Sequence, residues 1–135
     1  MAENIFLEVV TPSKVVVSED AQIVVAPGSE GEFGVLKGHT TFLTSLKLGT
    51  LRYKDSSGKD RVVFISGGFA EVLPNKVTVL AESAERRKDI DPERARRARE
   101  RAEKRLASGG NDVDFVRAEA ALRRSIHRLS IVGRT

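Results

Sequence analysis

Four arginines in the last third of the chain have the residue type and spacing needed to hold an anion. Arg94 and Arg101 are seven residues apart, and Arg124 and Arg128 are four apart, so each pair would project from one side of an α-helix. Guanidinium groups keep their charge and match the oxygens of a phosphate group. If two helices folded against each other, both pairs could converge on one anion. Salt bridges to neighbouring carboxylates are the alternative that the spacing leaves open.

Two carboxylates would lie at the mouth of such a site. Glu85 and Asp91 precede the first arginine, where they would be available to the polar edge of a base or to the arginines themselves.

Other reactive patterns are missing from the sequence. Lys37-Gly38 is followed by His39 and not by serine or threonine, as a phosphate-binding loop would require. Ser66-Gly67-Gly68 lacks the first half of a nucleophile elbow. The chain has no cysteine and two histidines, which excludes a thiolate site and argues against a histidine metal cage. We therefore expect a binding protein with no catalytic residues and no metal.

Two helices are expected to position the arginines. Asp91-Pro92 offers an N-cap and a proline at the first helical position, and Gly109-Gly110 ends the helix after Ser108. A second helix would be capped by Asn111 or Asp112. The small or apolar residues expected to face one another are Ala95, Ala98, Ala102 and Leu106 in the first helix and Phe115, Ala118, Leu122, Ile126 and Leu129 in the second. The short connection predicts an antiparallel α-helical hairpin.

The expected hairpin interface is thin. Alanine side chains bury little apolar area, which offsets little of the ordering cost of about 1 to 2 kcal/mol per residue. The hairpin should therefore detach or extend at a small cost in free energy, as a mobile regulatory arm would.

The residues before this hairpin predict β-strands. Short runs of β-branched and aromatic residues alternate with turn residues, and the expected strands cover residues 5–10, 21–26, 42–48, 51–54, 61–66, 69–73 and 77–80. The glycine-bearing segment 28–39 is interpreted as a loop and Gly67-Gly68 as a turn. Many short strands indicate an antiparallel β-sandwich or barrel. The expected domains are residues 1–84 and 85–135.

Charge divides the chain at the same place. Residues 1–84 carry 8 Lys+Arg and 10 Asp+Glu, and residues 85–135 carry 15 and 9, so net charges of −2 and +6 make up the total of +4. A basic nucleic-acid-binding module is one alternative. Against it, Phe115 is the only aromatic residue of the basic segment, and acidic residues are interleaved with the basic ones. No apolar run approaches the roughly 20 residues of a membrane span, and no signal peptide is evident, so a cytosolic location is expected.

Several stretches resemble the epsilon subunit of bacterial F-type ATP synthases. In order along the chain they are residues 28–36 and 38–39, 66–72, 77–81, and the motif Ile90-Asp91-x-x-Arg94-Ala95. The resemblance implies an antiparallel N-terminal β-sandwich followed by a C-terminal antiparallel α-helical hairpin. It also implies a non-catalytic rotor subunit of a proton-translocating enzyme. Such a subunit lies at the cytoplasmic face of the bacterial inner membrane and associates with the membrane only through the complex.

The resemblance also implies partners and contact residues. The sandwich would bind the gamma subunit and the c-ring, and residues 30–39 look like the segment facing the ring, with Glu32 and His39 at matched positions. The helical tail of this family can extend towards the alpha and beta subunits and inhibit ATP hydrolysis. Its basic charge suits acidic segments of beta, for which Arg105 and Arg117 are the expected contacts.

Some members of this family bind ATP in the folded hairpin, as a regulatory ligand and not as a required cofactor. The positions of this chain that match their nucleotide-binding residues are Glu85, Ile90, Asp91, Arg94, Ala95, Arg101, Arg124 and Arg128. ATP would favour the compact hairpin by binding it more tightly than the extended form, and low ATP would release the arm.

Overall fold

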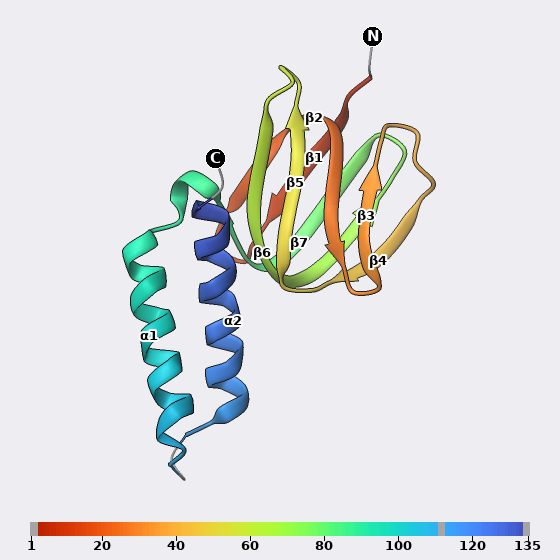
Figure 1. The fold of residues 1–135 in the computed structure, drawn as a ribbon. Helices are drawn as coiled ribbons and strands as arrows, with labels where there is room; N and C mark the ends of the chain where they lie inside the picture. The colour runs from red at the N-terminus through yellow and green to blue at the C-terminus, as the bar shows by residue number, and fades with distance from the viewer. Residues whose placement is uncertain (1–2, 111–112, 134–135) are drawn as a thin grey trace. The chain divides into compact units, whose positions relative to one another are not determined.

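The computed structural model describes residues 3–110 and 113–133 and divides the chain into two compact units, Met1–Arg87 and Lys88–Thr135 (Figure 1). The first unit holds the strands and the second holds both α-helices. The division falls three residues beyond the boundary expected from the sequence, because the last strand extends to Arg86.

The first unit is a seven-stranded β-sandwich (Figure 1). Two long strands, β2 and β6, each belong to both layers, because their two halves pair with different neighbours. The first half of β2 pairs with β1 and the second half with β3 and β5. The first half of β6 pairs with β5 and the second half with β4. The strands are β1 (Ile5–Val10), β2 (Val15–Gly28), β3 (Gly31–Val35), β4 (Phe42–Leu46), β5 (Gly49–Asp55), β6 (Asp60–Val72) and β7 (Lys76–Arg86). The pairings are antiparallel except that of β1 with β7, which is parallel.

Two expectations about the strands were wrong. Residues 31–35, expected within a loop, form β3, which pairs with β2. Gly67 and Gly68, expected as a turn, lie inside β6 with φ angles of 72° and 116°. A Cβ at Gly68 would lie 2.1 Å from the carbonyl oxygen of Leu80 in β7. Glycine therefore lets β6 pass close to its neighbour and continue from one layer to the other.

The core lies between the two layers. Alternate residues of β1, namely Ile5, Leu7 and Val9, are fully buried, as expected for a strand with one face toward the core. They pack with buried residues of the other strands, including Val24, Leu51, Ile65, Val72 and Val79. Burial of each such side chain contributes about 1.5 to 3 kcal/mol, so this unit has a core large enough to fold around.

Two titratable residues near the end of β5, Tyr53 and Asp55, have shifted pKa values. Tyr53 is buried, and desolvation raises its pKa to about 12. The Asp55 carboxylate accepts hydrogen bonds from the hydroxyl of Ser57 at 2.7 Å, from the backbone N–H of Lys59 at 2.9 Å, and from Nε of Arg61 at 3.1 Å. These donors hold the pKa of Asp55 well below its usual range. The network closes the turn between β5 and β6.

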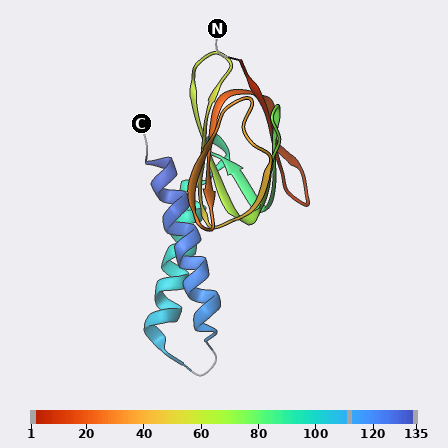
Figure 2. The same ribbon diagram turned by 90° about the vertical axis from the view of Figure 1, so that its right-hand side faces the viewer.

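The second unit is a helical hairpin made of α1 (Pro92–Ser108) and α2 (Phe115–Val132), which run antiparallel and side by side (Figures 1 and 2). A short 3-10 helix, η1 (Arg87–Asp89), precedes it. The expected ends of α1 are confirmed: Asp91 is the N-cap, and Gly109 is left-handed with a φ of 60°. The N-cap of α2 is Asp114, whose carboxylate accepts the N–H of Arg117. It is not Asn111 or Asp112, which lie outside the described residues.

The hairpin interface is built from small side chains. Ala95 and Ala102 of α1 are buried and Ala98 and Leu106 are half-buried, as expected.

The expected stripe of α2 was partly wrong. Phe115 and Ile126 are each 48% exposed. Ala118 is buried as expected, and the other buried residues of α2 are Ser125 and Ile131, which the expected stripe did not include. Ser125 is fully buried because its hydroxyl donates to the carbonyl of Leu122 at 2.8 Å. The true stripe is therefore centred on Ala118 and Ser125.

Candidate anion-binding face and docking surfaces

The motif Ile90-Asp91-x-x-Arg94-Ala95 forms the start of α1. Ile90 and Ala95 are buried, and Asp91 Oδ1 accepts the backbone N–H groups of Glu93 at 3.0 Å and of Arg94 at 3.2 Å. Both bonds use the same oxygen atom, so Oδ2 remains available to a ligand. The motif thus has a structural role in starting the helix and presents one carboxylate oxygen beside Arg94.

Three arginines of α1 share one flank. Successive helical residues are rotated by about 100°, so Arg94, Arg101 and Arg105 fall within an arc of about 40° that holds no carboxylate. All three side chains are exposed. Among the described residues none of them forms an ion pair, so the salt-bridge alternative does not hold for them.

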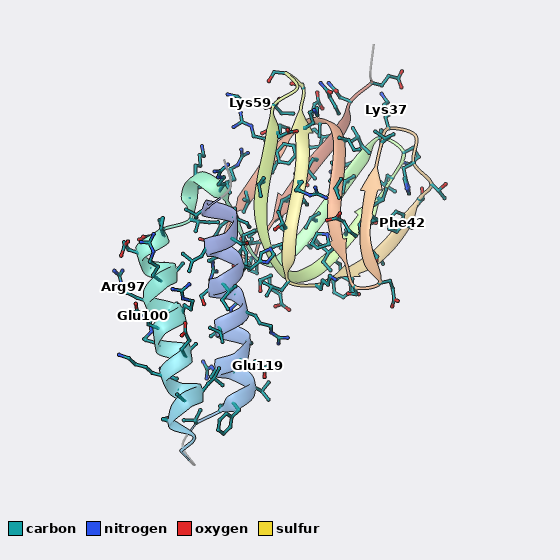
Figure 3. The ribbon with its side chains drawn as sticks, viewed as in Figure 1. Lys37, Phe42, Lys59, Arg97, Glu100 and Glu119 are labelled. Atoms are coloured by element: carbon teal, nitrogen blue, oxygen red, sulfur yellow. The ribbon has the colours of Figure 1, made fainter. Side chains whose placement is uncertain are left out.

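The ion pairs of α1 lie on its other flank. Arg96 pairs with Glu93, and Arg99 Nε lies 3.3 Å from an oxygen of Glu103. Arg97 projects between the two flanks, near Glu100 (Figure 3). The helix is therefore unevenly charged, with carboxylates and their partners on one flank and unpaired arginines on the other.

Three arginines of α2 share a flank in the same way. Arg117, Arg124 and Arg128 fall within an arc of about 40°. Arg117 is exposed, whereas Arg124 and Arg128 are half-buried. On each helix the arginines lie about 90° around the helix axis from the buried stripe, which is Ala95 and Ala102 in α1 and Ala118 and Ser125 in α2. The direction of this rotation is the same in both helices. Because antiparallel helices are related by a two-fold axis perpendicular to their common plane, both flanks lie on one side of the hairpin.

We call these residues the arginine face: Arg94, Arg101, Arg105, Arg117, Arg124 and Arg128. At the loop end of the hairpin, Arg105 and Arg117 line one hollow of about 460 Å³ together with Val113, Asp114 and Ala118. At about 1.5 Å per residue, Arg94 and Arg128 lie at the same distance from this hollow along their helices. The corresponding distances of Arg101 and Arg124 differ by less than one helical turn. The face therefore consists of three successive arginine pairs, one member from each helix.

The arginine face unites half of the candidate site residues. Both arginine pairs expected to hold a nucleotide lie on it, and so do the two arginines expected to contact a partner, which the sequence alone did not place together. Glu85 belongs to β7 of the first unit, where it is half-buried opposite Phe64.

The two contact residues expected on the sandwich are held by neighbours. Glu32 lies on β3, where its carboxylate accepts a hydrogen bond from Arg52 at 2.7 Å in a largely exposed ion pair. His39 lies in the connection between β3 and β4. Its Nδ1 donates to the carbonyl of Thr40 at 2.7 Å, and its ring lies 5.2 Å from that of Phe42. Glu32 is thus exposed on β3, and His39 is half-buried in the connection that follows.

An apolar row on the sandwich was not predicted from the sequence. Leu43 of β4, Phe69 of β6 and Leu80 of β7 are 70%, 56% and 57% exposed, and Phe69 lies directly opposite Leu80. A hollow of about 560 Å³ adjoins the last two and is also lined by Val10, Thr11, Pro12, Leu46, Gly67, Gly68, Ala81 and Glu82. Exposed contiguous apolar surface marks interaction sites. The sequence did contain a signal for this row: Leu43, Phe69 and Leu80 are apolar at strand positions that face solvent, where the alternation of a half-buried strand predicts polar residues.

Two kinds of feature are absent from the described residues, a metal site and a membrane-spanning helix. In residues 3–110 and 113–133 there is no group of three or more histidine, aspartate and glutamate side chains that could hold a metal ion. Over the same residues, no helix is both long enough and apolar enough to cross a membrane.

Comparison with known proteins agrees with the two units. A family model described as "ATP synthase, Delta/Epsilon chain, beta-sandwich domain" matches residues 4–87, and one described as "ATP synthase, Delta/Epsilon chain, long alpha-helix domain" matches residues 88–133. The ATP synthase epsilon chain of Desulforapulum autotrophicum is 72% identical over 132 residues, 98% of each chain. That of Nitratidesulfovibrio vulgaris is 56% identical over 133 residues, again 98% of each chain.

Solved structures share the fold. A chain in the structure of the Euglena gracilis mitochondrial ATP synthase, comprising OSCP, F1 and the c-ring, is 30% identical with a TM-score of 0.74 over 88% of this chain and 75% of its own. A chain in the central stalk and c-ring structure from Tetrahymena thermophila matches at 16% identity and a TM-score of 0.56, over 96% of this chain and 94% of its own, which supports the fold alone. With both family models matched in order and close relatives aligned from end to end, the chain belongs to the ATP synthase epsilon chain family, whose members are non-catalytic subunits of that enzyme.

Proposed function

We propose that this chain is a central-stalk subunit of a proton-translocating F-type ATP synthase that inhibits ATP hydrolysis through its helical hairpin and senses ATP with it. The observation that carries the proposal is the arginine face, because it brings the four arginines of the nucleotide pattern to one side of two weakly joined helices. Only a ligand or partner that carries negative charge would bind there favourably.

The sandwich is the docking part in this proposal. The apolar row on β4, β6 and β7 would bind the gamma subunit, since burial of exposed leucine and phenylalanine favours association. The segment with Glu32 and His39 would face the c-ring. The Euglena gracilis structure, which contains F1 and the c-ring, supports an assembly that includes both of these parts. Through them the subunit would be peripheral to the cytoplasmic face of the bacterial inner membrane.

The hairpin is the regulatory part. ATP would place its phosphates between Arg94 and Arg101 of α1 and Arg124 and Arg128 of α2, and would favour the compact hairpin. Binding at a concentration 100 times the dissociation constant stabilises the bound state by about 2.7 kcal/mol. That is enough to decide the state of a helix pair joined mainly by alanines. Without ATP the arm would extend towards the alpha and beta subunits.

The inhibitory role is tested by removing the hairpin. The chain ending at Arg87 keeps all seven strands, and in the assembled complex it should still bind gamma while the rate of ATP hydrolysis rises. A truncated complex that hydrolyses ATP no faster than the intact one would exclude an inhibitory arm.

The nucleotide role is tested by calorimetry on the isolated chain. Arg94→Ala and Arg124→Ala should each weaken ATP binding by about tenfold or more, as expected for loss of a hydrogen bond to a charged group. Arg96→Ala is the matched control, because Arg96 lies on the opposite flank and pairs with Glu93. No heat at millimolar ATP, or an equal loss in the control, would exclude the site.

A further inference from the structure

Strand β7 is part of the docking surface and also leads to the hairpin. Its residue Leu80 belongs to the apolar row, and Ala81 and Glu82 line the hollow beside that row. The strand ends at Arg86, and the second unit begins at Lys88. At about 3.3 Å per residue, Leu80 and Arg86 are about 20 Å apart along the strand. A movement of the hairpin would therefore pull on a strand that carries part of the docking surface.

The last residues of β7 have a strand on one side only. Within residues 3–110, the pairing of β1 with β7 ends at Leu80, and only the pairing of β6 with β7 continues to Arg86. A segment with fewer neighbours opens locally at a lower cost in free energy than the centre of a sheet. The end of β7 would therefore fray first when the hairpin moves, unless side chains hold it.

Arg86 holds this end of β7 against β2. Ala84 is buried, and Arg86, two residues further along, lies on the same face of the strand. Its Nε donates to the carbonyl oxygen of Val16 at 2.8 Å, and its Nη2 lies 3.3 Å from Oε2 of Glu19. Hydrogen bonds from a guanidinium group are stronger than those between neutral groups. A single side chain thus ties two segments that are 70 residues apart in sequence.

The carbonyl that accepts this bond lies at a bulge in β2. The register of β1 against β2 uses Val15 and Val17 but passes over Val16. The extra residue of a bulge is left out of the ladder, so the carbonyl of Val16 is directed to a partner outside it. Arg86 supplies that partner.

We propose that Arg86 is an anchor that separates the two functions of the chain, holding the end of β7 in place while the hairpin moves. Opening of the hairpin would then be confined to residues after Arg86, beginning with η1, which contains no buried residue. The docking surface around Leu80 would stay unchanged. The inference rests on the proposed function for the roles of the apolar row and the hairpin, whereas the anchor itself requires neither a nucleotide nor a partner.

The anchor is tested by hydrogen exchange of the backbone amides in the full chain. Arg86→Gln should speed exchange at residues 82–86 by about tenfold or more, as expected for loss of a hydrogen bond from a charged group. It should leave residues 76–80 unchanged. Glu19→Gln keeps the bond to Val16 and should have a smaller effect.

Arg61→Gln is the matched control. Arg61 also forms an ion pair within the sandwich, with Asp55, but its loss should not alter exchange at residues 82–86. An equal effect of the control, or no effect of Arg86→Gln, would overturn the anchor. Faster exchange spread over all seven strands would overturn it too, because Arg86 would then support the sandwich as a whole.

The separation of functions is tested by loosening the hairpin. Asp114→Ala removes the N-cap of α2 and leaves β7 untouched. With Arg86 present, it should change exchange at residues 80–86 by less than about twofold, the usual limit for independent sites. In the Arg86→Gln chain the same substitution should speed it well beyond that limit. Equal effects of Asp114→Ala in both chains would refute the separation.

Binding to an isolated gamma subunit tests the consequence for docking. The chain with both Arg86→Gln and Asp114→Ala should bind gamma more weakly than either single variant, whereas Asp114→Ala alone should bind as the unchanged chain does. Equal affinity of the double variant and the unchanged chain would show that Arg86 does not protect the docking surface. If the unchanged chain does not bind gamma, the proposed docking role is wrong, and the exchange rates still decide whether Arg86 is an anchor.

Discussion

Asp91 is predicted to have two functions that substitution can separate. Its Oδ1 caps α1 through two backbone N–H groups, and its Oδ2 is available to a nucleotide. Removing an N-cap costs about 1 kcal/mol, which is about a fivefold change in the helix equilibrium. Losing a charged hydrogen bond to a ligand costs about 1.5 to 3 kcal/mol, or about tenfold and more in affinity. The two effects therefore differ in size as well as in kind.

The second N-cap of the hairpin supplies the control. Asp114 caps α2 through one N–H at 3.0 Å and is not in the nucleotide set. Asp114→Ala should loosen the hairpin and weaken ATP binding by no more than about fivefold. Asp91→Asn keeps a good cap but removes the charge, so it should leave the hairpin closed and still weaken ATP binding by about tenfold. Asp91→Ala should show both effects.

Two measurements distinguish these outcomes. Hydrogen exchange of the backbone amides of α1 and α2 reports opening of the hairpin, and calorimetry reports the ATP affinity of the same samples. If Asp91→Asn binds ATP as tightly as the unchanged chain, Asp91 is only a cap. If Asp114→Ala weakens binding as much as Asp91→Ala, the loss comes from helix opening and the assignment of Asp91 to the ligand is refuted.

Three further predictions concern the sandwich. Gly68→Ala should lower the free energy of unfolding by at least about 2 kcal/mol, because the new Cβ would clash with the backbone of Leu80 and because residue 68 has a positive φ. Denaturant unfolding measures this change, and Gly34→Ala is the control, since a Cβ at Gly34 would make only ordinary contacts. Tyr53, the single tyrosine, should ionise in the folded chain with a pKa of about 12, so stability should fall as the pH rises from about 10 towards 12; an absorbance titration with a midpoint near 10 would contradict its burial. Since the folded pKa of Asp55 is depressed, the stability it contributes is present above about pH 4 and lost as the pH falls below that value; acid unfolding of Asp55→Asn should lack this contribution, and an unchanged acid profile would refute it.

The sequence predicted elements whose signals are local. Asp91-Pro92 and Gly109 mark the ends of α1 through their own backbone preferences, and both ends were confirmed. The segment Asn111 to Asp114 contains three residues that can cap a helix, and the choice of Asp114 depends on loop geometry that no single residue encodes. The glycines of β3 and β6 suggested turns, because only the packing of β6 against β7 reveals that Gly68 allows a close approach.

Half of the arginine face was predictable. Spacing correctly indicated that Arg94 and Arg101 share a side of α1, and that Arg124 and Arg128 share a side of α2. Bringing the two sides together depends on where each helix is buried. If the expected stripe, which includes Ile126, were the buried one, the arginines of α2 would lie about 140° around the helix axis from the interface. With the observed stripe, this angle is about 90°. The burial of Ser125 made the difference, since a serine does not appear in a search for apolar periodicity.

The expected weakness of the hairpin and the compactness of its arginine face have the same cause. The buried residues of the hairpin include Ala95 and Ala102 of α1 and Ala118 and Ser125 of α2. Helices that meet through such small residues lie at the short end of the usual range of interaxial distances, about 8 to 10 Å. Larger residues would bury more apolar area and make the hairpin more stable. They would also separate the two arginine flanks, so that one phosphate chain could no longer reach both. A strongly joined hairpin would thus lose the ligand-dependent state on which the proposed regulation depends, because the arginines come together only when the interface stays thin.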